Sequence, residues 1–193
     1  MDATKSLFIR AKHWQLFLLF AIFFIVGTGA LLVTIVSSPE RALGRPWPFF
    51  AAMELLALSL AAWQWSVGDF LNSTVPLPFR MKPTLFRVTV LFVPLYLPVF
   101  IVFLENLNHW RSAALILLSF AIIIPMHLFA FCCQIYSWYF VSKAIVLAEN
   151  PRPVSFTDYV GYFFAVWLFP VGVWIIQPRI NRLYKPTLHE QPQ

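Results

Sequence analysis

The chain has 193 residues, of which 60% are hydrophobic and only 11% are charged, and its net charge is +6. Its charged residues lie almost entirely in short gaps between long apolar runs, and these gaps are too short to build a separate water-soluble core. The composition therefore excludes a soluble globular protein and predicts one integral membrane domain over residues 1–193. The basic residues lie beside the apolar runs, which favours the lipid bilayer and its anionic head groups, and not nucleic acid, as their partner.

Four apolar runs are each long enough to cross a bilayer, which takes about 20 residues of helix. They cover residues 14–36, 49–71, 86–104 and 112–141. The first run is too long for the apolar part of a cleavable signal peptide, so we expect it to remain as the first membrane helix. Pro94 and Pro98 lie inside the third run and predict a kinked helix there.

A last apolar segment, residues 157–177, has two interpretations. Ser155 with Asp158 three residues later is typical of a capping box that starts a helix, and Pro170 and Gly172 predict a break in the middle. The segment is either a fifth span or a re-entrant segment that enters and leaves on one side of the membrane.

The distribution of Lys and Arg favours the re-entrant interpretation. With the N-terminus inside, a re-entrant segment places eleven of these residues on the cytoplasmic side and three outside, whereas a fifth span gives eight and six. Positive residues favour cytoplasmic loops. We therefore predict an all-α polytopic membrane helical bundle of four transmembrane helices plus a C-terminal Pro/Gly-broken re-entrant segment, with five transmembrane helices as the alternative.

Three stretches resemble a known group of proteins. They are Ala11-Lys12-His13-Trp14-Gln15-Leu16-Phe17, Pro125-Met126-His127-Leu128-Phe129, and residues 169–181, which read FPVGVWIIQPRIN. The chain resembles an uncharacterised family of short multi-span bacterial inner-membrane proteins. The resemblance covers nearly the whole chain, and it implies a bacterial inner-membrane location and no activity. The cytoplasmic N-terminus is predicted from the distribution of Lys and Arg.

The second span carries a narrow face of small and polar residues. Its members fall within a wedge of about 80° around the helix axis, and they are Glu54, Ala57, Ala61, Gln64 and Gly68. Small residues let helices approach closely, and polar residues form hydrogen bonds across the contact. This face is either a helix-packing seam or one wall of a polar pathway.

The fourth span carries a similar face within about 120°. It comprises Ser112, Ser119, His127, Ala130, Cys133, Gln134 and Ser137. Exposure of His127 and Gln134 to lipid is unfavourable, so we expect this face to point into the bundle. His127 is either an interior histidine satisfied by a hydrogen bond, or a protonatable site or cofactor ligand. Gln64 and His127 each lie about 22 Å into their helices, which makes them the pair expected to meet.

The candidate site therefore consists of the intramembrane residues Glu54, Gln64, Ser119, His127 and Gln134. Just beyond the expected break, Arg179, Asn181 and Arg182 are candidates for contact with a lipid phosphate or a partner protein. The histidines have no metal-ligand spacing, no catalytic motif is present, and the sequence does not identify a cofactor.

Three functions are compatible with this pattern. The first is a non-enzymatic accessory or scaffold subunit of a membrane complex, which binds other membrane-protein subunits or associates with itself. The second is a small oligomeric transporter or channel whose path is lined by the two polar faces. The third is a lipid-acting membrane enzyme with His127 or Glu54 as acid or base.

Overall fold

The structure, a computed structural model, describes residues 3–37, 47–106 and 112–189, and every regular element within these ranges is helical. Four helices are long and apolar enough to cross a membrane: α2 (His13–Ser37), α4 (Trp47–Thr74), α5 (Pro83–Asn106) and α6 (Ala113–Glu149). The other elements are α1 (Ala3–Arg10), the short 3-10 helix η1 (Leu77–Phe79), α7 (Phe156–Trp167) and α8 (Phe169–His189). The prediction of an all-helical fold with four membrane-length helices is confirmed.

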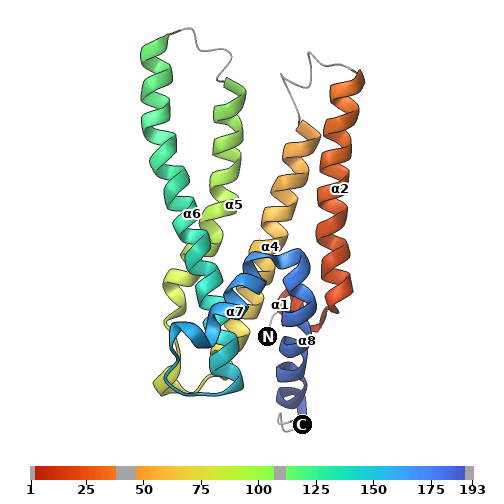
Figure 1. Cartoon of the computed structure of the whole chain (residues 1–193), viewed down its shortest axis with the longest axis vertical. Helices are drawn as coiled ribbons and strands as arrows, with labels where there is room; N and C mark the ends of the chain where they lie inside the picture. Colours follow the sequence, from red (N-terminus) through yellow and green to blue (C-terminus); the bar gives the residue numbers. More distant parts are fainter. Residues whose placement is uncertain (1–2, 38–46, 107–111, 190–193) are drawn as a thin grey trace.

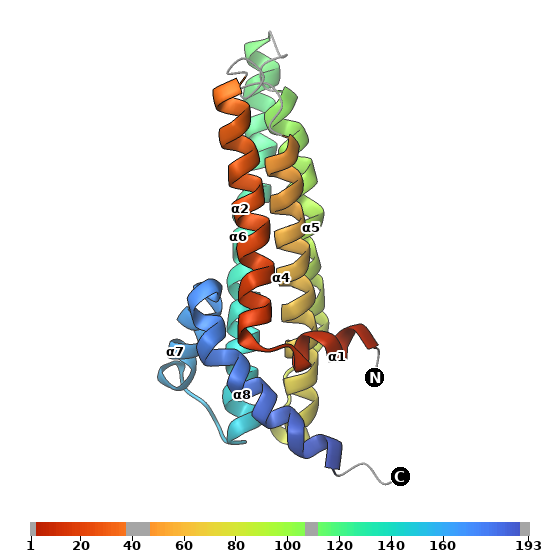
Figure 2. The ribbon, with the colours of Figure 1, turned by 90° about the vertical axis from the view of Figure 1, so that its right-hand side faces the viewer.

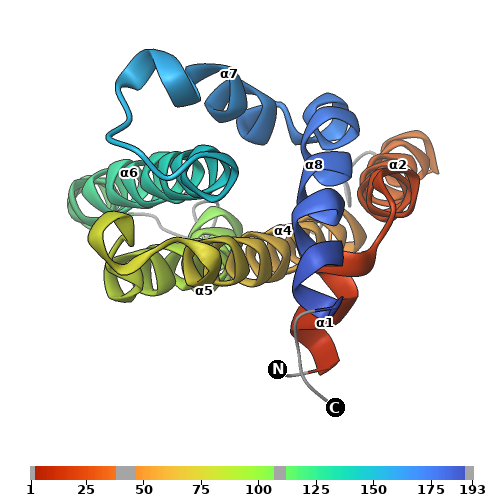
Figure 3. The ribbon, with the colours of Figure 1, turned by 90° about the horizontal axis from the view of Figure 1, so that it is seen from below.

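The four long helices form two antiparallel pairs, α2 with α4 and α5 with α6 (Figure 1). The pairs contact each other through α4, which packs on both α5 and α6. Viewed along the helices, α7 lies on one side of the row formed by α5 and α4, and α8 crosses this row at α4 toward α1 (Figure 3). Both termini lie toward the same end of the molecule (Figures 1 and 2).

The C-terminal apolar segment folds into a helical hairpin. Helix α7 rises part of the way along the bundle, and α8 returns toward the end that holds the termini (Figure 2). The break is at Leu168, whose backbone leaves the helical region with φ −86° and ψ 47°. Pro170 lies in the first turn of α8, where a missing N–H costs nothing. The predicted four spans with a broken segment that turns back are therefore confirmed.

Gly172 permits the close approach of the two arms of this hairpin. A Cβ atom built on Gly172 would lie 1.7 Å from the carbonyl oxygen of Ala165 in α7. No side chain fits at that distance, so the tight turn requires glycine at this position.

Helix α6 extends about two turns beyond the predicted span, which ended at residue 141. The added turns are mostly buried, with Ala144 and Ile145 fully inaccessible. They lie where α7 and α8 pack against α6. The added turns are therefore buried by contacts within the protein.

The largest apolar core lies where the hairpin meets the four long helices. Trp63 of α4 and Phe169 at the tip of the hairpin pack edge to face, with ring centroids 4.6 Å apart. Phe86 of α5 and Phe140 of α6 stack at 4.1 Å in the same core. A second, smaller core around Tyr96 and Ile123 joins α5 to α6.

Candidate functional site

The small and polar face of α4 packs partly against α5. A Cβ atom on Gly68 would lie 2.5 Å from the ring of Phe86 in α5, so glycine allows that ring to approach the backbone. Ala61 and Gln64 are buried on the same helix. This part of the face is therefore a helix-packing seam, which is one of the two interpretations of the sequence.

Two polar groups of α4 are left without partners. Gln64 is only 1% exposed, yet its Nε2 makes no hydrogen bond in the described part of the chain. One carboxylate oxygen of Glu54 is likewise buried without a partner. Such groups are costly in an apolar environment. Of the two residues, only Glu54 is partly exposed and so remains a candidate for contact with a molecule other than this chain.

The corresponding face of α6 packs against α5. Ala130, Cys133 and Ser137 are buried. The hydroxyl of Ser137 lies 3.3 Å from the hydroxyl of Thr89 in α5 and 2.9 Å from the carbonyl oxygen of Cys133. The expectation that this face points into the bundle holds for these three residues but is wrong for His127, which is exposed.

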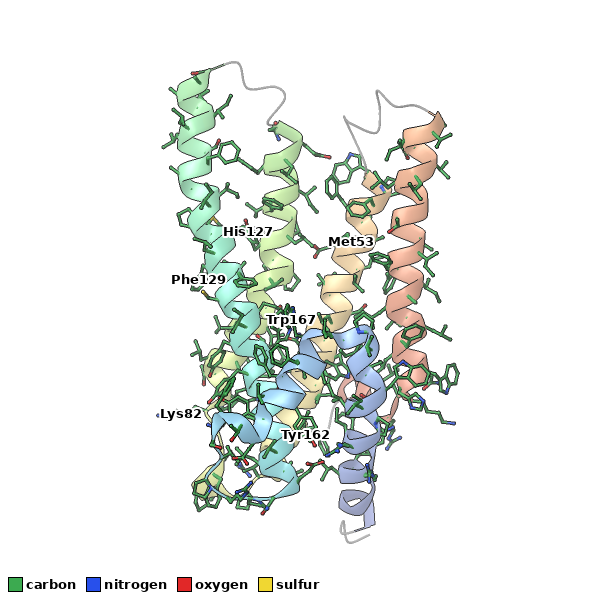
Figure 4. The ribbon with its side chains drawn as sticks, in the orientation of Figure 1. Met53, Lys82, His127, Phe129, Tyr162 and Trp167 are labelled. Atoms are coloured by element: carbon green, nitrogen blue, oxygen red, sulfur yellow. The ribbon has the colours of Figure 1, made fainter. Side chains whose placement is uncertain are left out.

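His127 lies at the edge of that seam, in the half of the bundle away from the termini (Figure 4). Its Nδ1 is 3.2 Å from the hydroxyl of Tyr96 in α5, and its ring is 5.1 Å from that of Phe100. Tyr96 is buried, but His127 itself is exposed. Its second ring nitrogen, Nε2, has no hydrogen-bond partner among the described residues. One side of the imidazole is therefore held by α5, and the other remains available.

The two remaining α6 candidates, Ser119 and Gln134, differ in their hydrogen bonding. The hydroxyl of Ser119 donates to the carbonyl of Ile116 in its own helix, whereas the Nε2 of Gln134 is buried without a partner. No hydrogen bond within the described ranges joins any two of the five intramembrane candidates; the bond of His127 goes to Tyr96 and not to Gln64. In the same ranges, no three His, Cys, Asp or Glu side chains gather as a metal-binding group.

One face of α8 binds the turn between α1 and α2, residues 11–12, which we call the elbow. Gln177 is fully buried, and its Nε2 lies 3.0 Å from the carbonyl oxygen of Phe8 and 2.9 Å from that of Ala11. Its Oε1 accepts a 3.1 Å hydrogen bond from Nε1 of Trp63 in α4. The last carbonyl groups of a helix have no partner within the helix, so Gln177 satisfies the end of α1 and ties it to α4.

Two further residues of α8 complete this attachment. Asn181 donates to the carbonyl of Ala11 at 3.3 Å, and the hydroxyl of Tyr184 accepts from Nε of Arg10 at 2.9 Å. Positions 177, 181 and 184 follow the spacing of one helix face. That spacing is visible in the sequence, but nothing in the sequence indicates what the face contacts, so Gln177 was missed as a candidate.

The three predicted lipid or partner contacts have distinct environments. Asn181 is engaged with α1, as described above. Arg179 pairs with Glu149 at the end of α6 at 3.3 Å, and it also bonds the hydroxyl of Tyr162 in α7. Arg182 is exposed and makes no hydrogen bond or ion pair with the described residues, although its charge is near Tyr162.

Tyr162 of α7 joins its own helix to the end of α6 and to α8 in this cluster. Its hydroxyl donates to Glu149 at 3.0 Å, while the guanidinium of Arg179 lies over its ring at 5.2 Å. Burial raises the pKa of Tyr162, and the neighbouring Glu149 raises it further. The hydroxyl therefore keeps its proton at neutral pH and acts as a hydrogen-bond donor.

The capping box predicted at the start of α7 is present. Asp158 accepts the backbone N–H of Ser155 at 2.7 Å and also pairs with Arg152 at 2.8 Å. The hydrogen bonds from Ser155 hold the pKa of Asp158 below its ordinary value, and Arg152 lowers it further.

Comparison of the chain with protein families, with curated proteins and with solved structures gives no match. The family resemblance therefore remains a prediction, and function rests on the geometry described above.

Proposed function

We propose that this chain is a non-enzymatic accessory subunit of a membrane complex, and that it binds a transmembrane helix of its partner beside His127. The observation that carries the proposal is an exposed imidazole inside a membrane-length helix. His127 is held on one side by Tyr96, while its Nε2 has no acceptor or donor within the described chain. Lipid tails offer no hydrogen bond, so a polar group there favours a protein neighbour.

The surroundings of His127 suit a helix–helix contact. Leu128 and Phe131 on the same helix are 60% and 56% exposed. An apolar helix surface with one polar group gives van der Waals packing together with a directional hydrogen bond, and both drive the association of membrane helices. When the Tyr96 hydroxyl donates to Nδ1, the ring proton resides on Nε2, which then donates to the partner.

The proposed location is the bacterial inner membrane, with the N-terminus in the cytoplasm. Eleven of the fourteen Lys and Arg residues lie in elements and loops at the end of the bundle that holds the termini, including Lys82 (Figure 4). The other three, Arg41, Arg45 and Arg111, lie outside the described residues. This asymmetry supports a cytoplasmic position for that end.

Site-directed photocrosslinking in native membranes tests the proposal. A photoreactive amino acid replaces Phe131, one turn from His127, so that the histidine itself is retained. The matched control carries it at Leu117 of the same helix, which is 71% exposed. We expect a protein adduct from position 131 and not from position 117, and mass spectrometry then identifies the partner.

A second variant shows whether the histidine matters. His127→Leu in the same background should reduce the adduct several-fold while the protein still inserts. An adduct with lipid alone would contradict the subunit proposal. An adduct with a second copy of the chain would identify self-association in place of a different subunit.

A further inference from the structure

A crevice of about 580 Å³ lies in the elbow between α1 and α2, at the basic end of the molecule. Its walls are mainly apolar and include Leu7 and Phe8 of α1 and Leu16 and Leu19 of α2. Arg10 and Gln15 also line it and supply polar groups. In Figure 2, α1 lies across the end of α2, as expected of a helix at the membrane surface.

The polar groups of this crevice suit an anion. Nε of Arg10 is anchored on the hydroxyl of Tyr184 at 2.9 Å, and its guanidinium lies over the Tyr184 ring at 5.5 Å. The two terminal nitrogens of Arg10 have no hydrogen bond to the described residues, and Arg10 is exposed. A guanidinium with free terminal N–H groups is well suited to bind phosphate oxygens.

The N-terminal end of α2 adds to the attraction of the crevice for an anion. Helix α2 begins at His13, so the positive end of a 25-residue helix dipole lies beside the crevice. Oε1 of Gln15 accepts the backbone N–H of Lys12 at 2.8 Å, while its amide nitrogen has no partner among the described residues. That amide is available to donate to an ester oxygen.

The elbow is also held in a fixed shape. Gln177 and Asn181 bond the carbonyl of Ala11, where the chain turns from α1 into α2. A fixed crevice loses less conformational entropy on binding than a flexible one.

We infer that this elbow binds one anionic phospholipid, with its phosphate at Arg10 and an acyl chain along Leu16 and Leu19. The complementarity has two parts, because the guanidinium matches the head group and the apolar walls match the chain. A soluble anion would use only the first part. This site is independent of the partner contact proposed at His127.

Lipid titration followed by native mass spectrometry tests the inference. The full-length protein in mild detergent is titrated with phosphatidylglycerol and, separately, with phosphatidylcholine of the same acyl chains. We expect the first bound phosphatidylglycerol to have the higher affinity. Arg10→Gln should weaken its binding about fivefold, the effect of removing one basic group from an anionic surface.

Two further variants separate a site from general charge attraction. Lys82→Gln removes an exposed charge at the same end of the molecule but away from the elbow, and it should leave the affinity unchanged. Leu19→Trp keeps the charge but fills the apolar wall, and it should weaken binding as Arg10→Gln does. Equal losses in Arg10→Gln and Lys82→Gln, or equal affinity for the two lipids, would overturn the inference. Thermal unfolding of each variant confirms that the fold is retained.

Discussion

Trp63 Nε1 in α4 donates to Gln177 Oε1 in α8 at 3.1 Å, and both side chains are buried. Nε2 of the same Gln177 lies within hydrogen-bond distance of the carbonyl oxygens of Phe8 and Ile9 in α1 and of Ala11 in the turn that leads to α2. One amide thus joins the N-terminal helix, a membrane-length helix and the C-terminal hairpin.

Replacement of Gln177 should therefore destabilise the whole end of the bundle. Gln177→Leu leaves the Trp63 N–H and the end of α1 without partners, and each unsatisfied buried group costs about 1–3 kcal/mol. We expect a loss of about 2–3 kcal/mol in the free energy of unfolding, measured by chemical denaturation in detergent micelles. Gln64→Leu is the matched control, because Gln64 is equally buried but makes no hydrogen bond to the described residues, so its replacement should not lower stability. Hydrogen exchange in α1 should increase only in the Gln177 variant.

The α7–α8 hairpin should tolerate no side chain at position 172. In Gly172→Ala the new methyl group would overlap the backbone of Ala165, so the two arms must separate. We expect loss of folded protein or a markedly lower midpoint of thermal unfolding. Gly161→Ala in α7 is the control, because a Cβ there meets no atom within 4 Å. It should be neutral or stabilise by up to about 1 kcal/mol. Equal behaviour of the two variants would show that the hairpin does not form as described.

The start of α7 should weaken in acid. The pKa of Asp158 is lowered in the folded protein from an ordinary value of 3.8, so its contribution to stability is fully present above that value. It is lost as the pH falls through the depressed folded pKa, because the carboxylate that accepts from Ser155 becomes protonated. Hydrogen exchange of the first turn of α7 should increase at low pH in the native protein. In Asp158→Asn it should already be fast at neutral pH, with little further change in acid.

The direction of the hairpin predicts the side on which the C-terminus lies. A green fluorescent protein fused after Gln193 should be fluorescent, and alkaline phosphatase fused there should be inactive, as for a cytoplasmic end. A phosphatase fusion between α5 and α6 should be active. The opposite result at the C-terminus alone would mean that α7 and α8 together cross the membrane.

The sequence was sufficient to predict the elements whose signal is local. Apolar length predicted the four long helices, and Pro170 and Gly172 predicted the break in the last segment. The Ser155–Asp158 spacing predicted the cap of α7. Each of these depends on residues that are close together in the chain.

Features that depend on distant contacts were not predictable in this way. The partner of His127 is Tyr96, 31 positions away, whereas depth along the helices predicts Gln64. The bond between Gln177 and Phe8 joins residues 169 positions apart. The extra turns of α6 are buried where the hairpin packs on them, and the sequence of a single helix considered alone does not contain that information.

The attachment of α1 to α8 has a consequence for biosynthesis. The first helix leaves the ribosome long before Gln177 is translated, and the N-terminal part of a chain generally begins to fold first. Until the last helix is inserted, the carbonyl groups at the end of α1 lack the partners that Gln177 and Asn181 provide. A nascent chain that ends after α6 contains all four membrane-length helices, but its α1 still lacks these hydrogen bonds to α8. Insertion of α7 and α8 therefore completes the fold. Before that step α1 is accessible, and this accessibility distinguishes an unfinished chain from a finished one for a quality-control protease.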